Sequence, residues 1–140
     1  MPFYQCITPP GTLDSERKQR IVDGITRIHC EATGALALYV QIEFQEVSPD
    51  NMFQGGKKSR AVRLHARIRK GRDAQTRHQM LKDYTSLLHE QTGVAVKDIM
   101  VAFIETPYEN VMESGLRLPA PGDEAQWLEQ VRALFPHEFG

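Results

Sequence analysis

Residues 26–34 read TRIHCEATG, and residues 85–93 read TSLLHEQTG. A shift of 59 positions superimposes the identical residues of these segments, pairing Thr26, Glu31, Thr33 and Gly34 with Thr85, Glu90, Thr92 and Gly93. The same shift superimposes Phe44 on Phe103 and Glu46 on Glu105. The sequence therefore predicts an internal duplication, in which each copy carries a helix that ends at a glycine.

Hydrophobic periodicity around the two segments predicts the same order of elements in each copy. The elements expected in the first copy are a strand at 3–7, a helix that begins at Asp14 or Ser15, and a strand at 38–45. Those expected in the second copy are a strand at 62–69, a helix ending near Gly93, and a strand at 99–103. Each copy is thus a βαβ unit, and residues 47–61 are predicted to form a connecting loop.

A helix that links two strands of one sheet is long enough for a right-handed parallel crossover. We therefore expect an α+β fold, in which two tandem βαβ units form a four-stranded mixed sheet with two helices on one face. The expected single domain, 1–140, consists of repeat one (about 2–47), repeat two (about 61–106) and a C-terminal tail (107–140). The other sheet face needs a cover, which predicts an oligomer and a tail that packs over a neighbour or a cleft.

Composition excludes several classes of function. The 17 Lys and Arg residues balance 18 Asp and Glu residues, so the chain lacks the net positive charge typical of nucleic-acid or membrane binding. Cys6 and Cys30 form no CxxC pair, and the five histidines show no metal-ligand spacing, so neither a disulfide framework nor a metal site is expected. Without a long apolar run or a signal peptide, a cytoplasmic location is predicted.

The strongest local charge signal is the segment 57–72, which contains eight basic residues and no carboxylate. Arg69 and Arg72 flank a Lys-Gly step where the strand is predicted to turn into the second helix. Two guanidinium groups at such a position could hold a substrate carboxylate by bidentate hydrogen bonds. The alternative is that these arginines only pair with Glu43, Glu46 or a partner chain.

Pro2 is a second candidate, because an initiator Met1 that precedes a small residue is normally removed. Its removal would leave a secondary amine. Burial and the nearby cations Arg69 and Arg72 would lower the pKa of this amine, which suits an acid–base group near neutral pH. The alternative is a proline without a catalytic role. If Met1 is retained, the nitrogen is an amide and this chemistry is blocked.

Five features occur here in one order: Pro2, TRIHCEATG (26–34), FQEVSPDNMFQGG (44–56), RKGR (69–72) and VMESGLRLPAPG (111–122). In this combination the chain resembles the tautomerase superfamily, and within it the cis-3-chloroacrylic acid dehalogenase subgroup. The similarity runs over nearly the whole length. It implies a fused βαβ duplication, a trimer of such chains and an enzyme that needs no cofactor.

The resemblance also implies roles for individual residues. Pro2 would transfer the proton, and Arg69 and Arg72, assisted by His29, would bind the substrate carboxylate. Glu113 would activate a water molecule for addition to the substrate. From the residues alone, His29 could equally be a histidine at the edge of the core, and Glu113 an ordinary loop acid.

One departure affects the expected activity. Ala102 stands where the dehalogenases have a tyrosine that assists the glutamate, and whether Tyr108 replaces it is open. We therefore expect keto–enol tautomerisation of small 2-oxo or 2-hydroxy unsaturated carboxylates, with at most weak hydratase or dehalogenase activity on 3-haloacrylates. The alternative is a ferredoxin-like module that binds RNA or a small ligand without catalysis.

Overall fold

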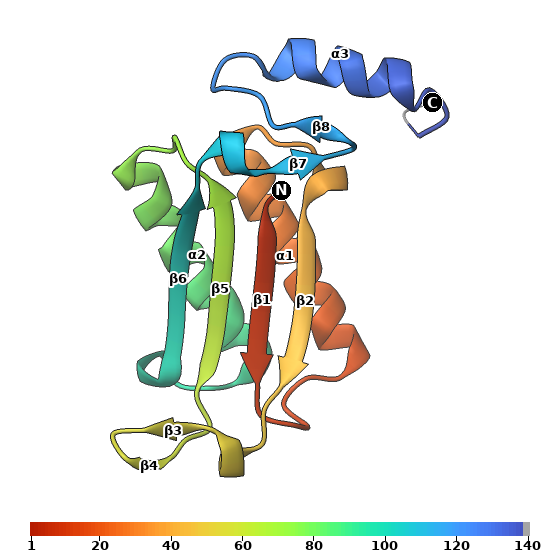
Figure 1. Cartoon of the computed structure of the whole chain (residues 1–140). Helices are drawn as coiled ribbons and strands as arrows, with labels where there is room; N and C mark the ends of the chain where they lie inside the picture. The colour runs from red at the N-terminus through yellow and green to blue at the C-terminus, as the bar shows by residue number, and fades with distance from the viewer. Residues whose placement is uncertain (139–140) are drawn as a thin grey trace.

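The computed structural model describes residues 1–138, and its elements follow the predicted duplication (Figure 1). The first half contains β1 (Phe3–Thr8), α1 (Ser15–Thr33), η1 (Ala37–Tyr39), β2 (Gln41–Glu46), η2 (Pro49–Asn51), β3 (Phe53–Gln54) and β4 (Lys57–Lys58). The second contains β5 (Val62–Arg69), α2 (Ala74–Thr92), η3 (Val96–Asp98), β6 (Ile99–Thr106), η4 (Tyr108–Asn110), β7 (Met112–Glu113) and β8 (Leu116–Arg117). The helix α3 (Glu124–Leu134) follows.

The sheet has the order β2-β1-β5-β6, and both long helices cover the same face (Figure 1). β1 pairs with β2 in parallel, β5 pairs with β6 in parallel, and the two halves meet where β1 and β5 pair antiparallel. The predicted α+β fold is therefore confirmed. The alternative prediction of a ferredoxin-like module is wrong. In that fold another strand lies between the two strands of each βαβ unit, whereas the two strands of each unit here are neighbours.

The two long helices begin and end by the same chemistry, because the duplication preserved their capping residues. Asp14 accepts a hydrogen bond from the backbone N–H of Arg17 at 2.8 Å, and Asp73 does the same for Thr76 at 2.7 Å. Each helix has 19 residues and is closed by a glycine in the left-handed region. Such a φ strains other residues, which accounts for a glycine at the end of both repeated segments.

Two expectations about local structure were wrong. The strand predicted at 38–45 begins only at Gln41, because Ala37–Tyr39 form a 3₁₀ turn that leaves Leu38 exposed. The predicted loop 47–61 contains the hairpin β3-β4, and the tail contains the matching hairpin β7-β8. Short two-residue strands give no hydrophobic period, so the alternation pattern missed them.

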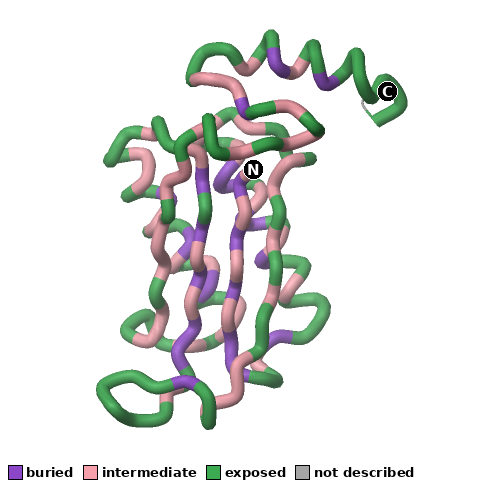
Figure 2. The backbone as a smooth tube through the Cα atoms, in the orientation of Figure 1, coloured by how far each residue is buried: buried purple, intermediate pink, exposed green. Residues whose placement is uncertain are grey.

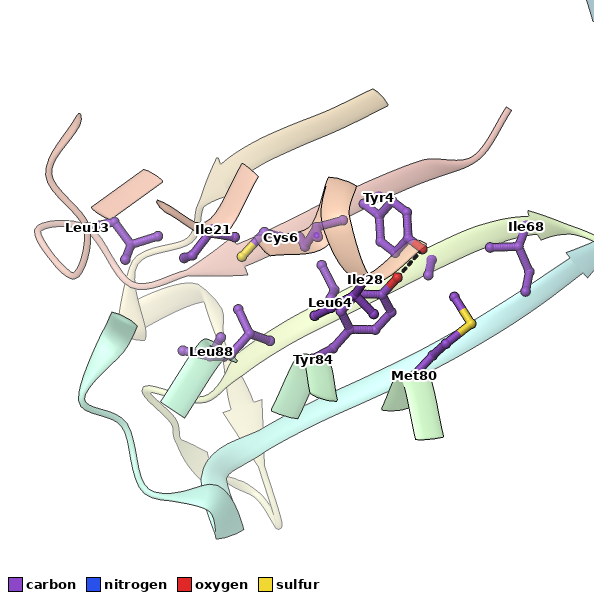
Figure 3. Close-up of a cluster of buried hydrophobic side chains, with 13 residues drawn as sticks. Tyr4, Cys6, Leu13, Ile21, Ile28, Leu64, Ile68, Met80, Tyr84 and Leu88 are labelled. Atoms are coloured by element: carbon purple, nitrogen blue, oxygen red, sulfur yellow. Dashed lines mark hydrogen bonds between the residues drawn. The ribbon is translucent and has the colours of Figure 1, made fainter. Parts of the chain in front are cut away.

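The core lies between the sheet and the two helices (Figures 2 and 3). Side chains from the inner face of β1 and β5 pack against apolar side chains of α1 and α2, among them Tyr4, Cys6, Ile21, Ile25, Leu64, Ile68, Met80, Tyr84 and Leu88. A smaller cluster around Leu118, Trp127 and Val131 attaches the C-terminal segment to one end of the sheet. Within residues 1–138, none of the helices has the length and apolarity that a bilayer crossing requires.

Candidate active site

The strand register brings the N-terminus to the predicted arginines. Phe3 lies opposite Arg67 in the antiparallel pair β1-β5, so two further residues along this pairing place Met1 beside Arg69. β5 finishes at this end of the sheet, and the hairpin β7-β8 and helix α3 lie over the same end (Figure 1). Segments from both halves and from the tail therefore converge here.

A cavity of about 410 Å³ lies at this end of the sheet, and most of the predicted site residues line it. His29, Arg69, Arg72 and Glu113 all line it, together with Met1. The side chain of Pro2 is fully buried directly behind Met1. The structure thus brings together the five predicted residues, from Pro2 to Glu113, which lie up to 111 positions apart in the sequence.

Met1 determines the chemical state of the N-terminus in this structure. Its α-ammonium forms an ion pair with the Oε2 atom of Glu113, and both groups are largely buried. The nitrogen of Pro2 is acylated by Met1 and carries no proton or lone pair for catalysis. It is three bonds from the ammonium, so the two nitrogens lie within about 3.7 Å of each other. An amine exposed by loss of Met1 would consequently lie within reach of this cavity.

Arg69 is held by the C-terminal segment. Its guanidinium donates to the carbonyl oxygen of Pro119 at 3.0 Å and to Oε1 of Glu124 at 2.5 Å. Burial raises the pKa of Glu124, but the hydrogen bond from Arg69, the charge of Arg69 and backbone N–H donors together lower it below its usual value. The pairing expected with Glu43 or Glu46 is wrong for this arginine. Glu124 carried no local signal in the sequence, because helix α3 and strand β5 meet only in the folded chain.

Arg72 is in a different situation. It lines the cavity, and no carboxylate within residues 1–138 forms an ion pair with it. Partial burial and the neighbouring charge of Arg69 lower its pKa, although Glu124 acts in the opposite sense. A cation that is partly desolvated and repelled by a second cation attracts an anion strongly. The geometry therefore offers Arg72 as the cation with unused hydrogen-bonding capacity.

His29 is almost fully buried, with 3% of its surface exposed. Its Nδ1 atom lies 2.7 Å from the hydroxyl oxygen of Tyr4. Burial, the charge of Arg72 and the charge of the N-terminus together lower the pKa of His29 to about 4. The imidazole is therefore neutral at physiological pH. The structure places His29 at the edge of the core and also in the lining of the cavity.

This buried neutral histidine predicts a pH-dependent stability. Between pH 6.5 and 4 the unfolded chain binds a proton at His29 that the folded chain excludes, so stability is lost as the pH falls. We expect urea unfolding of the wild type to lose about 2 kcal/mol more between pH 7.5 and 5 than unfolding of His29→Gln. His78→Gln, on the exposed face of α2, is the matched control. Equal pH dependence in all three proteins would contradict the burial of a neutral His29.

Sequence reasoning missed several residues that line the cavity. Tyr39, Trp127 and Leu128 contribute aromatic and apolar walls, and the Tyr39 hydroxyl lies 3.3 Å from Oγ of Ser114 beside Glu113. Tyr108 does not line the cavity and packs against the cluster around Leu118, Trp127 and Val131. Tyr39 lies within the range 38–45 that was predicted as a strand, whereas in the structure it ends the 3₁₀ turn η1 and its hydroxyl contacts Ser114.

Ala102 lies away from this cavity, opposite His65 in the pairing of β5 with β6. Among residues 1–138, no group of three or more His, Cys, Asp or Glu side chains is arranged to hold a metal ion.

Comparisons with known proteins agree with this architecture. Residues 1–132 match the Tautomerase_3 family, described as "Putative oxalocrotonate tautomerase enzyme". The crystal structure of native Ps01740 is 34% identical, covers 79% of this chain and 99% of its own, and has a TM-score of 0.77. That of N1, a member of the cis-3-chloroacrylic acid dehalogenase family, is 29% identical over 97% of this chain and 96% of its own, with a TM-score of 0.89.

More distant structures share the fold. One fused 4-OT, F6, forms an asymmetric trimer and is 20% identical over 86% of this chain and 98% of its own, with a TM-score of 0.78. The comparison with curated proteins found no match.

Proposed function

The chain belongs to the Tautomerase_3 family of the tautomerase superfamily, and from this premise we propose that it is an acid–base enzyme whose proton carrier is the amino-terminal nitrogen of Pro2. The expected substrate is a small 2-oxo or 2-hydroxy unsaturated carboxylate. One observation carries the proposal: the N-terminus, Arg72 and Glu113 meet in a single cavity of about 410 Å³.

Keto–enol tautomerisation requires only two of these elements. The Arg72 guanidinium, beside Arg69, would bind the substrate carboxylate and stabilise the charge of the dienolate. The free nitrogen of Pro2 would accept the proton of the enol hydroxyl as a carbonyl forms, and would then donate a proton to carbon. No net change of redox state occurs and no cofactor is needed, because one proton moves from oxygen to carbon.

Hydration of a 3-haloacrylate is the second candidate, and the position of Glu113 favours it. Its carboxylate lines the cavity and lies close enough to the N-terminus to pair with the ammonium of Met1. As base, Glu113 would take a proton from water as the water oxygen bonds to the carbon that bears the halogen, while protonated Pro2 supplies a proton to the adjacent carbon. The resulting halohydrin would then lose the halide and a proton and leave an aldehyde. With Ala102 at the position of the assisting tyrosine, we expect this reaction to be the slower one.

We also propose a homotrimer, by analogy with the fused 4-OT trimers. The sheet face opposite the helices bears Met100 and Ile104, which are 48% and 46% exposed in the single chain. A neighbouring subunit would cover these side chains. Equilibrium sedimentation tests the stoichiometry directly, and a monomer at micromolar concentration would exclude the trimer.

The proposed activity is tested by a panel of assays on one preparation. Mass spectrometry first establishes whether Met1 is absent. Ultraviolet assays then follow ketonisation of phenylenolpyruvate and 2-hydroxymuconate, and chloride release is measured from both 3-chloroacrylate isomers. We expect ketonisation to be faster than chloride release. Rapid chloride release from the cis isomer would instead make the dehalogenase the main activity, and no turnover of any substrate would refute the proposal.

A further inference from the structure

Behind His29 lies a buried chain of hydroxyl groups that the proposed mechanism does not use. Tyr4 of β1 bonds to Nδ1 of His29 at 2.7 Å, and to the hydroxyl of Tyr84 of α2 at 2.6 Å. Figure 3 shows the two phenol groups meeting inside the core between the sheet and α2. Both tyrosines are 0% exposed, and burial raises the pKa of each, so both keep their protons.

The protons of this chain can be assigned by elimination. Each phenol has one hydrogen to donate, and a buried hydroxyl hydrogen without an acceptor costs about 1–3 kcal/mol. Within residues 1–138, Tyr84 has only the Tyr4 oxygen as a hydrogen-bond partner, so Tyr84 donates to Tyr4. Tyr4 must then donate its own hydrogen to His29. Nδ1 of His29 is consequently an acceptor, and the ring proton resides on Nε2.

The opposite assignment leaves a buried proton unsatisfied. If Nδ1 of His29 donated to Tyr4, the hydrogen of either Tyr4 or Tyr84 would lack an acceptor among the described residues. The structure has only one buried side-chain polar atom without a partner in this range, and it is Nε1 of Trp127. The core is thus built with every hydroxyl of this chain satisfied.

We infer that Tyr4, whose hydroxyl oxygen accepts from Tyr84, is a positioning residue that holds His29 as the neutral Nε2–H tautomer, which presents an N–H donor to the substrate carboxylate beside Arg72. The inference rests on the proposed function for the identity of the ligand, but not for the tautomer. The other tautomer would turn a lone pair toward the carboxylate and repel it.

A neutral donor also fits the charges that surround His29. The positive charges of Arg72, which follows β5, and of the N-terminus, which precedes β1, both disfavour an imidazolium at His29. Arg69 already adds a second guanidinium to the cavity. A third cation would repel Arg72 and would favour deprotonation of the N-terminal amine still further. The hydroxyl chain allows His29 to contribute a hydrogen bond without adding that charge.

Nuclear magnetic resonance tests the tautomer without any substrate. Two-bond correlations between ring nitrogens and carbon-bound protons distinguish Nε2–H from Nδ1–H in ¹⁵N-labelled protein at pH 7.5. His89 is an internal reference, because its Nδ1 atom lies 2.8 Å from the carbonyl oxygen of Val94 and must donate to it. We expect His29 and His89 to give opposite patterns. The same pattern for both residues would overturn the assignment.

Variants of the tyrosines test the function of the hydroxyl chain. The double variant Tyr4→Phe/Tyr84→Phe removes both hydroxyls together, and so leaves no hydroxyl hydrogen without an acceptor. We expect mixed tautomers of His29 and a three- to tenfold rise in KM for the carboxylate substrate, with kcat within twofold of wild type. Tyr108→Phe, which removes a hydroxyl outside the cavity, should change neither.

The outcomes separate this inference from the proposed function. An unchanged tautomer or an unchanged KM in the double variant would overturn the inference while leaving the enzyme intact. A wild type that turns over none of the carboxylates would refute the proposed function, and the resonance pattern of His29 would still decide the tautomer. A single Tyr84→Phe variant keeps the donor Tyr4 and should retain the Nε2–H form.

Discussion

Replacing Pro2 with alanine is expected to lower kcat/KM for ketonisation at least tenfold, which corresponds to about 1.4 kcal/mol of lost transition-state stabilisation. The proline ring fixes φ and holds the nitrogen in one orientation at the start of β1. Alanine is also a small residue, so Met1 should still be removed and the variant still has a free amine. The comparison therefore measures what the ring adds, because a primary amine at this position can rotate away from the substrate. The measurement is the initial rate of ultraviolet change at pH 7.5.

A chain with one alanine inserted before Pro2 is the matched control for the free nitrogen. Loss of Met1 then leaves an Ala-Pro terminus, in which the Pro2 nitrogen is an amide and the new ammonium occupies the position that Met1 takes beside Glu113. We expect at least as large a loss as in Pro2→Ala, with unchanged unfolding in urea. Full activity in this extended protein would show that Pro2 is not the proton carrier.

The duplication made most of the fold predictable. A shift of 59 positions relates α1 to α2 residue by residue, so the predicted cap at Asp14 and the predicted closing glycine Gly34 have counterparts in Asp73 and Gly93. The hairpins were missed because two-residue strands have no period. The repeat itself contained a signal for them, since the same shift relates Gly56 to Gly115.

The site was only partly predictable, and for a different reason. Pro2 and Arg69 were proposed from their positions in the sequence and Glu113 from the family resemblance, but the residues that contact them lie in other segments. Glu124 reaches Arg69 only because the C-terminal segment docks through its own small core. Tyr84 of α2 is connected to His29 of α1 only through the hydroxyl of Tyr4 on β1, and these three residues are far apart in the sequence. Contacts between distant elements leave no local pattern, so single-sequence reasoning has nothing to detect.

The two arginines should differ sharply when each is truncated, although both line the cavity. Arg69→Ala leaves Glu124 and the Pro119 carbonyl without their donor, so this variant should lose both stability and activity. Arg72 has no ion-pair partner within residues 1–138, and Arg69 repels it. Arg72→Ala should therefore unfold within about 0.5 kcal/mol of wild type, as surface variants usually do.

The same Arg72→Ala variant should nevertheless lower kcat/KM for the carboxylate substrate at least a hundredfold, or about 2.7 kcal/mol. The substrate anion would lose a charge-assisted pair in a partly desolvated cavity, where such a pair is strong. Arg60→Ala, an exposed change in the same basic segment, controls for the general loss of one positive charge. Steady-state kinetics and urea unfolding of the three proteins measure both effects. If Arg60→Ala and Arg72→Ala lose activity equally, long-range attraction and not a specific carboxylate contact accounts for substrate binding, and the clamp assigned to Arg72 is wrong.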